Sequence, residues 1–320
     1  MSYDDEVRSH LTRADFLKAL RSVGIGAAAL AGGLGTNMGS GSAAMAMKTR
    51  PIPSTGERIA IVGLGTYKSF NTGPSAAERA PHKKVLQILF EQGSTLIDTA
   101  PMYKPAETVI GDLLRELGLT QKAFVATKVR TAGKENGLAS YDMSEKLLGK
   151  GSIDLMQVHS LKDWKTQLPM IRDMKAAGRW RYIGITHSNT KKHDNVIKVM
   201  GKEKLDFIQI NYSLLERNAE KRILPMAADK GMAVLINKPF VKAKMFKKVK
   251  GQKLPEWAKE FDCTSWGQFF LKFILSHPAV TAAIPATRTP KYMIDNAAAG
   301  RGRMPDAKER QKMIQLWESL

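Results

Sequence analysis

The sequence predicts an α/β protein whose parallel strands close into a (β/α)8 TIM barrel, with an N-terminal β-hairpin and extra C-terminal helices. Three observations predict this class. Short apolar runs alternate with longer amphipathic runs from residue 59 onwards. The first run leads into "VGLGTYKSF", which lacks the phosphate-binding glycine turn of an open doubly wound sheet. A length of 320 residues suits one such barrel.

The expected elements follow one another along the chain. The stretch "RPIPSTGERIA", residues 50–60, is rich in turn residues and predicts a hairpin that plugs the barrel floor. Eight short, bounded apolar runs predict the strands, at residues 59–66, 95–100, 123–129, 154–160, 182–188, 207–213, 233–239 and 280–286. Amphipathic patterns between them predict helices, for example at residues 77–92, 107–117 and 216–230. An eighth helix should follow Pro290, two should lie within residues 254–276, and a last one should span residues 306–319.

The chain divides into an N-terminal segment, residues 1–46, and one barrel domain, residues 47–320. The segment "LTRADFLKALRSVGIGAAALAGGLG" has a basic start and an apolar core of small residues, and "AMA" at residues 44–46 offers a cleavage site. It resembles a bacterial twin-arginine export signal, with matches at Thr12, Arg13, Phe16, Leu17 and Lys18. Ala14 stands in place of the second arginine. We expect a signal peptide that is removed or disordered and a periplasmic protein, with a cytoplasmic location as the alternative.

The charge balance limits the classes of partner. The formal net charge is +20, and the excess lies in the barrel part, partly in "VKAKMFKKVKGQK", residues 241–253. Basic clusters favour phosphorylated ligands, nucleic acid or anionic membranes. Aromatic residues do not alternate with the basic ones, and no nucleic-acid-binding motif is present, so no nucleic-acid partner is expected.

Other features of the composition exclude several further classes. Hydrophobic residues make up 43% of the chain, which allows a sizeable core and excludes a disordered protein. The single cysteine, Cys263, excludes an internal disulfide and a cysteine-based metal cluster, and no metal site is expected. Apart from the weakly apolar N-terminus, no apolar run is long enough to span a membrane. We expect a monomer without a transmembrane segment in the mature protein.

Ionisable side chains stand at the ends of three successive predicted strands: Asp98, Lys128 and His159. In parallel barrels the functional groups come from these strand ends and the loops that follow them. A buried lysine without a counter-ion is costly, and Asp98 would supply one. Tyr103, five residues after Asp98, would lie over the pair. Alternatively, Asp98 caps the following helix and Tyr103 is a boundary aromatic, although three such groups in succession favour a shared site.

These four residues and their spacing resemble the catalytic tetrad of the aldo/keto reductases. The likeness runs in order through residues 50–300 and includes "GLGT", "DTAPMY", "ATKV", "IDLMQVH", "AAGRWRYIGIT", "FIQINYSLLER" and "IPATRTPKYMIDN". It implies an NAD(P)-dependent enzyme that reversibly reduces an aldehyde or ketone to an alcohol. Tyr103 would be the general acid, and we expect the ammonium of Lys128 to lower its pKa. Asp98 would orient Lys128, and His159 would orient the carbonyl oxygen.

The same resemblance implies a nicotinamide dinucleotide across the barrel mouth. The lysine-rich loop, residues 241–253, favours NADP(H) over NAD(H), because NADP(H) carries an additional phosphate. The expected contacts are Gly65, Thr66, Thr186, His187, Gln209, Asn237, Pro239, Phe240, Thr287, Arg288, Lys291 and Asn296. Gln209 matches the glutamine that binds the carboxamide, and Asn237 stands where many members stack a tyrosine on the nicotinamide. Ala286 and Tyr292 replace the lysine and arginine that bind the 2′-phosphate, so Arg288 and Lys291 are expected to do so instead.

The substrate is less sharply indicated than the chemistry. Tyr67 and Trp164 are expected to contact it, and Trp164 together with Trp317 suggests a pocket lined by aromatic residues. Two other classes of function stay open. The first is a barrel that binds cofactor with little turnover and acts as a redox sensor or regulator. The second is a protein that binds anionic surfaces, a hypothesis that only the net charge supports.

Overall fold

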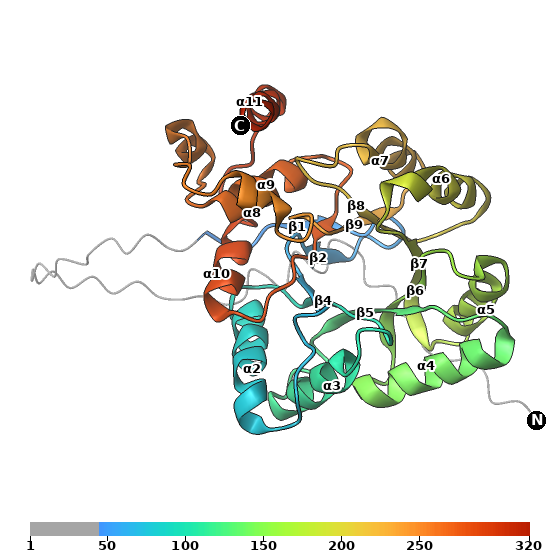
Figure 1. Cartoon of the computed structure of the whole chain (residues 1–320). Coiled ribbons are helices and arrows are strands. Elements are labelled where there is room, and N and C mark those ends of the chain that lie inside the picture. The colour runs from blue at the N-terminus through green and yellow to red at the C-terminus, as the bar shows by residue number, and fades with distance from the viewer. Residues whose placement is uncertain (1–44) are drawn as a thin grey trace, which may run out of the picture. The chain divides into compact units, whose positions relative to one another are not determined.

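The computed structural model describes residues 45–320, and a curled sheet of eight parallel strands lies at the centre of this part (Figure 1). Each strand pairs with the next strand of the sheet in chain order. The strands are β3 (Leu64–Gly65), β4 (Leu96–Asp98), β5 (Phe124–Val129), β6 (Ile153–His159), β7 (Trp180–Thr186), β8 (Phe207–Asn211), β9 (Ala233–Asn237) and β10 (Ala282–Ala283). The expected α/β class with eight parallel strands is confirmed.

The two edges of the curled sheet approach each other. Parallel bridges join Val62 to Ala283 and Gly65 to Ala286, next to the short strands β3 and β10. The amide of Gly63 donates to the carbonyl of Ala283 at 2.9 Å. These contacts satisfy backbone groups that an open sheet edge would leave unpaired.

Helices follow the strands and surround the sheet (Figure 1). They are α2 (Ala76–Glu91), α3 (Ala106–Glu116), α4 (Lys134–Leu148), α5 (Trp164–Ala176), α6 (His193–Lys202), α7 (Ala219–Asp229), α8 (Lys244–Lys248), α9 (Trp266–Leu275), α10 (Pro290–Ala298) and α11 (Ala307–Ser319). The side chain of Ser75 caps α2 and that of Asp306 caps α11, each with a glutamate three residues on that completes a capping box. Within residues 254–276, the first expected helix is a short 3₁₀ helix, η2 (Glu256–Phe261), and the second is α9.

The expected hairpin forms from β1 (Thr49–Pro51) and β2 (Arg58–Ala60), which pair antiparallel. Ile52 and Ile59 are buried in the cluster that fills the interior of the sheet, together with residues from the starts of strands such as Phe124 and Phe207. The hydroxyls of Thr55 and Tyr182 lie 2.8 Å apart. The hairpin therefore covers the amino-terminal ends of the strands and leaves the carboxyl ends for other groups.

Two expectations concern the chain's relation to a membrane or an export route. None of the helices between residues 45 and 320 is long and apolar enough to cross a membrane. The expected twin-arginine signal falls almost entirely on residues 1–44, which lie outside the described residues.

Candidate active site

Neighbouring strands bring the predicted residues to one edge of the sheet. Asp98 is the last residue of β4, Lys128 lies near the end of β5, and His159 is the last residue of β6. Tyr103 belongs to the loop between β4 and α3. Because the strands are parallel and in register, these residues meet at the carboxyl end of the sheet, where functional groups of such folds gather.

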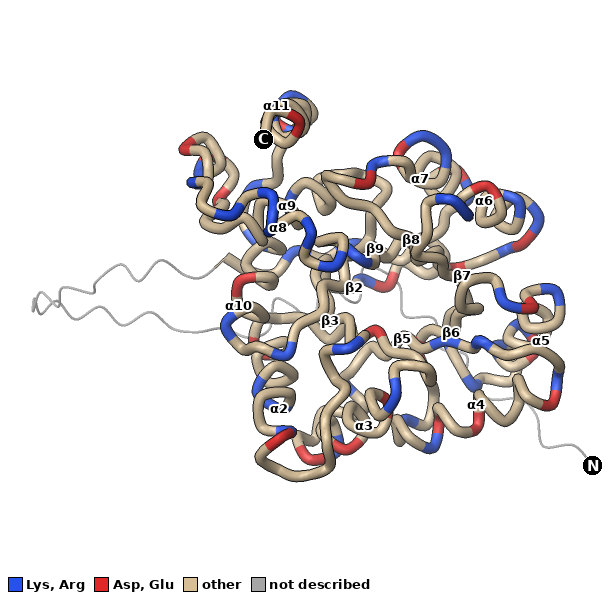
Figure 2. The backbone as a smooth tube through the Cα atoms, in the orientation of Figure 1, with Lys and Arg blue, Asp and Glu red and all other residues tan. Residues whose placement is uncertain are grey.

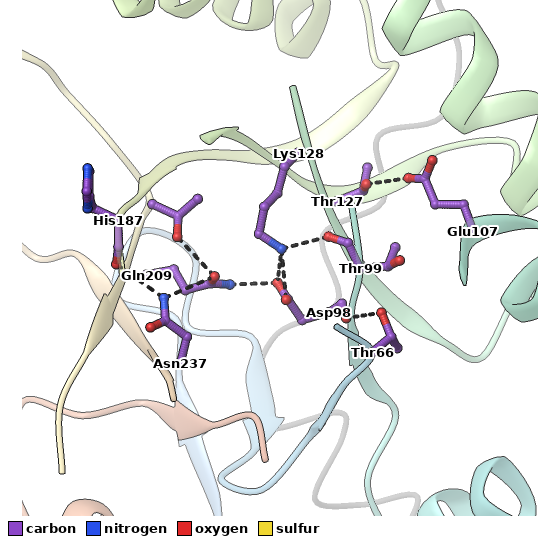
Figure 3. Close-up of polar contacts among 10 residues, drawn as sticks. Thr66, Asp98, Thr99, Glu107, Thr127, Lys128, His187, Gln209 and Asn237 are labelled. Carbon is purple, nitrogen blue, oxygen red and sulfur yellow. Dashed lines mark hydrogen bonds and ion pairs between the residues drawn. The ribbon is translucent and has the colours of Figure 1, made fainter. Parts of the chain in front are cut away.

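A buried ion pair joins Asp98 to Lys128 (Figure 3). The ammonium Nζ of Lys128 lies 2.7 Å from Oδ1 and 2.8 Å from Oδ2 of Asp98, and it donates to the carbonyl of Thr99 at 2.6 Å. Burial lowers the pKa of Lys128. The interactions with Asp98 and Tyr103 together raise it by more than burial lowers it, so the pKa lies above its ordinary value. Lys128 is therefore a charged group held in a fixed direction.

The phenol ring of Tyr103 lies above this pair. The Nζ of Lys128 is 5.2 Å from the ring centre, and the ring of His159 is 6.5 Å away, centre to centre. Burial raises the pKa of Tyr103 above 10.0, and this exceeds the lowering by the charge of Lys128. The expectation of a lowered pKa is thus wrong for this structure, because desolvation of the phenolate outweighs its attraction to the ammonium. Tyr103 keeps its proton at neutral pH, as a proton donor requires.

His159 is half-buried and neutral. Burial, with the charges of Lys128 and Arg130, lowers its pKa to about 3. Its Nδ1 lies 3.4 Å from the hydroxyl of Ser160, which can donate to it. A neutral imidazole has one N–H donor, and with Nδ1 as the acceptor that donor is Nε2. His159 can then offer a hydrogen bond without carrying charge.

Gln209 links the ion pair to the neighbouring strands (Figure 3). Its amide Nε2 donates to Oδ1 of Asp98 at 2.6 Å. Its Oε1 accepts from Thr186 at 3.0 Å and from the amide of Asn237 at 3.4 Å. The sequence places Gln209 beside the expected cofactor but does not show this bond to Asp98. The strand register sets Thr186 opposite Gln209, whereas the direction of the glutamine side chain depends on packing.

Asn237 provides a test of whether the site suits a nicotinamide. Its Nδ2 donates to the carbonyl of His187 at 3.2 Å, while its Oδ1 is buried without a hydrogen-bond partner among the described residues. An unpaired buried acceptor is unfavourable, and the NH2 of a carboxamide would satisfy it. The carboxamide of a nicotinamide therefore fits the residues present at this position. The bond from Asn237 goes to the backbone carbonyl of His187. The imidazole ring of His187 has a different partner: its Nδ1 accepts a hydrogen bond from the backbone amide of Asn189 at 3.2 Å.

Gly65 and Thr66, expected to contact the cofactor, have structural roles. A Cβ at Gly65 would lie 2.7 Å from the carbonyl oxygen of Ile284, so glycine allows the edges of the sheet to approach. The hydroxyl and amide of Thr66 donate to the carbonyl of Asp98 at 2.9 and 3.0 Å. These bonds fix the end of β4 and hence the direction of Asp98.

The residues expected at the adenosine end lie in the turn after β10 and in α10. Arg288 and Lys291 are exposed, and the ammonium of Lys291 lies 5.2 Å from the ring centre of Tyr292. Thr287 uses its hydroxyl locally, as the acceptor for the amide of Thr289 at 3.0 Å. Asn296 is buried. The exposed cations are thus available to an anion, and the hydroxyl of Thr287 is already engaged.

The loop after β9 carries much of the positive charge near the site (Figure 2). Pro239 is buried, and the ring of Phe240 packs on Phe246 with centres 4.9 Å apart. Lys238 donates to the carbonyl of Ser188. Within the described part, no lysine of residues 238–253 forms an ion pair with an acid. Acids of the described residues therefore do not neutralise the positive charge of this loop.

The residues expected to contact substrate lie in different surroundings. Tyr67 is exposed and meets the ring of Tyr103 edge-on at 5.1 Å. Trp164, at the start of α5, lines a cleft of about 370 Å³. Trp317 is buried against Phe270, so the suggestion that it lines a pocket with Trp164 is wrong. Among residues 45–320, no three His, Cys, Asp or Glu side chains gather as metal ligands.

Comparison with known proteins identifies relatives of this chain. The model of the aldo/keto reductase family matches residues 61–312. Aldo-keto reductase YhdN of Bacillus subtilis (strain 168) is 29% identical over 205 residues, 59% of this chain and 61% of that protein. The chain thus spans about three fifths of the length of this relative.

Two relatives come from Escherichia coli (strain K12). Methylglyoxal reductase YeaE is 27% identical over 261 residues, 79% of this chain and 89% of that protein. NADH-specific methylglyoxal reductase is 25% identical over 227 residues, 60% of this chain and 67% of that protein.

A solved structure shares the fold. It is an aldo/keto reductase from Klebsiella pneumoniae in complex with NADP and acetate, which superposes with a TM-score of 0.68 at 24% identity. The superposition covers 82% of this chain and 93% of that one.

Proposed function

The chain belongs to the aldo/keto reductase family, and from this premise we propose that it reduces an aldehyde or ketone to an alcohol, reversibly, with NADP(H) and with Tyr103 as general acid. Membership makes it an NAD(P)-dependent oxidoreductase. One observation carries the finer proposal: the buried pair of Asp98 and Lys128 lies beneath a phenol that keeps its proton.

The proposed division of labour follows from the protonation states. A bound nicotinamide supplies the hydride to the carbonyl carbon. Tyr103 donates its proton to the carbonyl oxygen, and the ammonium of Lys128 stabilises the phenolate that remains. Asp98 holds that ammonium in place, and neutral His159 donates a hydrogen bond that orients the oxygen. General acid catalysis of this kind contributes about 10²–10⁴-fold in rate.

Three groups of residues would hold the cofactor. Thr186, Gln209 and Asn237, with the loop at His187, would surround the carboxamide, supported by the unpaired Oδ1 of Asn237. The loop with Pro239, Phe240 and its unpaired lysines would face the pyrophosphate. The segment that holds Thr287, Asn296 and the exposed cations Arg288 and Lys291 would take the adenosine end.

Cofactor choice is the part of the proposal that relatives leave open. The Klebsiella pneumoniae structure contains NADP, whereas one Escherichia coli relative is NADH-specific. Fluorescence titration with each cofactor tests the preference, and Arg288→Ala should weaken NADPH binding about tenfold or more because it removes a charge-assisted bond to the 2′-phosphate. NADH binding should hardly change, and Arg222→Ala on α7 serves as the matched control. Equal losses for both cofactors would place Arg288 outside the 2′-phosphate site.

Turnover separates the enzyme from the alternative of a redox-sensing barrel. Methylglyoxal is the first substrate to test, since two relatives are methylglyoxal reductases. The proposal expects consumption of NADPH that depends on the aldehyde. Cofactor binding without consumption for any of a panel of aldehydes and ketones would support the sensor.

We further propose export by the twin-arginine route, on the sequence pattern of residues 1–46 alone. Ala14→Arg restores the arginine pair and should increase the periplasmic fraction of a reporter fusion, while Arg13→Ala should abolish it. A chain that starts at Met47 should fold and bind cofactor like the full chain. Export that is absent from the native sequence in a competent host would indicate a cytoplasmic protein.

A further inference from the structure

A cleft of about 370 Å³ opens beside the candidate active site between α5 and α6. Its walls come from the loop after β6, from the residue after β7 and from one side of α6. The chemically distinctive members are Ser160, Trp164, His187, Lys192, Lys198 and Lys202. Among residues 45–320, no acidic side chain lines this cleft.

The three lysines of the cleft share one side of α6. Lys198 and Lys202 are four residues apart, and Asn195 and Val199, which also line the cleft, fall on the same face. Lys192 precedes the helix by one residue. From Lys192 to Lys202 the helix rises about 15 Å, at 1.5 Å per residue. The cleft is thus long enough for an extended chain rather than for a single small ion.

The positive charge of the cleft is not neutralised by nearby carboxylates. Within the described part of the chain, none of the three lysines forms an ion pair. The acids closest to them along the chain have other partners: Asp194 binds Arg222 at 2.9 Å, and Glu203 binds Arg172 at 2.7 Å. Figure 2 shows basic residues along α6. An anion in the cleft would meet cations that form no ion pair with any acid of residues 45–320.

Two residues that line the cleft are chain neighbours of residues in the candidate active site. Ser160 directly follows His159, and the hydroxyl of Ser160 lies 3.4 Å from Nδ1 of that histidine. His187 directly follows Thr186, whose hydroxyl bonds Gln209. The strand register sets His159 opposite Thr186, so both chain segments leave the site at the same level and enter the cleft together. Trp164 contributes an apolar surface to the same cleft.

From these observations we propose that the cleft binds the anionic end of an extended carbonyl substrate, so that the enzyme prefers aldehydes or ketones carrying a distant carboxylate or phosphate. The carbonyl lies at Tyr103 and His159, the apolar chain passes Trp164, and the anion lies in the positive field of Lys192, Lys198 and Lys202. The inference rests on the proposed reductase function, because it places the reacting carbonyl at that site.

Matched substrates test the proposal on the full chain. Unbranched ω-oxo carboxylic acids of increasing length are compared with their methyl esters, which keep the carbonyl and the chain but lose the charge. The acid should have a higher kcat/KM than its ester once the chain is long enough to reach α6. The acid-to-ester ratio should fall about tenfold or more when Lys192, Lys198 and Lys202 are all replaced by methionine, since each exposed charge contributes up to about fivefold. Lys146→Met, at an exposed position of α4, is the control and should leave the ratio unchanged.

A long unbranched dicarboxylate provides a readout that needs no turnover. Calorimetry should show that it binds the wild type and binds the triple variant at least about tenfold more weakly, with Lys146→Met unchanged. A ratio near one at every chain length, or a ratio unaffected by the triple replacement, would overturn the proposal while leaving the reductase function intact. If every aldehyde is inert but the dicarboxylate still depends on the three lysines, the anion site stands and the reductase function fails. Where the aldehydes do turn over, comparing kcat/KM for a phosphate-bearing aldehyde with kcat/KM for the ω-oxo acids shows which anion the cleft prefers.

Discussion

At the scale of single residues, burial decides the protonation of Tyr103 and His159 more strongly than charge does. Burial is the largest cause of both pKa shifts, and it keeps the phenol protonated and the imidazole neutral. Lys128 behaves differently, because Asp98 lies 2.7 Å away and holds it charged in spite of complete burial. The three groups therefore offer an acid, a neutral hydrogen-bond donor and a fixed cation within one site.

These protonation states predict the pH dependence of reduction. Tyr103 must be protonated to act as acid, and its pKa is raised above 10.0, while the pKa of His159 is about 3. We expect kcat, measured at saturating NADPH, to stay nearly constant through pH 6.5, the ordinary histidine pKa, because His159 is neutral well below that pH. It should fall only as the pH rises through the raised tyrosine pKa. A fall centred between 6.5 and 10.0 would show that another group controls the proton transfer.

The buried ion pair predicts a difference between stability and activity. Lys128→Met leaves Asp98 buried without its counter-ion and should lower the free energy of unfolding by about 3–5 kcal/mol. Adding Asp98→Asn removes the stranded charge and should restore most of this loss, as urea unfolding can measure. Both variants should be inactive, because neither retains the ammonium beneath Tyr103. A double variant as unstable as the single one would mean that the pair does not act as a unit.

At the scale of elements, the sequence pattern predicts the order of the strands and the hairpin, but it does not predict the directions in which side chains point. Alternating apolar and amphipathic runs indicate the parallel sheet, and the ends of β4, β5 and β6 follow from where each apolar run stops. The bond from Gln209 to Asp98 depends on how side chains pack across the sheet, which no local pattern encodes. The same limit explains Tyr103: the sequence shows a nearby lysine but not the extent of burial that raises the pKa of the phenol.

Gly65 shows how an element can explain a residue that resemblance assigns to the cofactor. A Cβ there would lie 2.7 Å from the carbonyl oxygen of Ile284, a backbone atom that cannot easily move. Gly65→Ala should therefore lower the free energy of unfolding by about 1–3 kcal/mol, measured by urea or thermal denaturation. Gly151→Ala is the matched control, because a Cβ at Gly151 meets no atom within 4 Å. If Gly65→Ala is as stable as the wild type but binds NADPH more weakly, Gly65 contacts the cofactor and does not act through the packing of the sheet edges.

At the scale of the whole molecule, the net charge is +20, and within residues 45–320 several lysines around the proposed site form no ion pair. The lysines of residues 238–253 lie after β9, where the cofactor phosphates are proposed to bind. Those of the cleft on α6 lie on the side where the substrate is proposed to extend. Composition alone predicts an affinity for anions but cannot say which of many lysines have acidic partners. The arrangement of ion pairs supplies that distinction and suggests a protein specialised for two anionic ligands.

The central claim, that the full chain is a reductase whose acid is Tyr103, is tested most directly by single-turnover kinetics. The enzyme is loaded with NADPH and mixed rapidly with a reactive aldehyde, and the loss of NADPH absorbance is followed for the wild type, Tyr103→Phe and the control Tyr182→Phe, whose hydroxyl lies at the hairpin. We predict that Tyr103→Phe oxidises NADPH at least about a hundredfold more slowly while binding it as tightly as the wild type, since the phenol acts only where the proton moves. Oxidation by Tyr103→Phe at the wild-type rate would contradict the account.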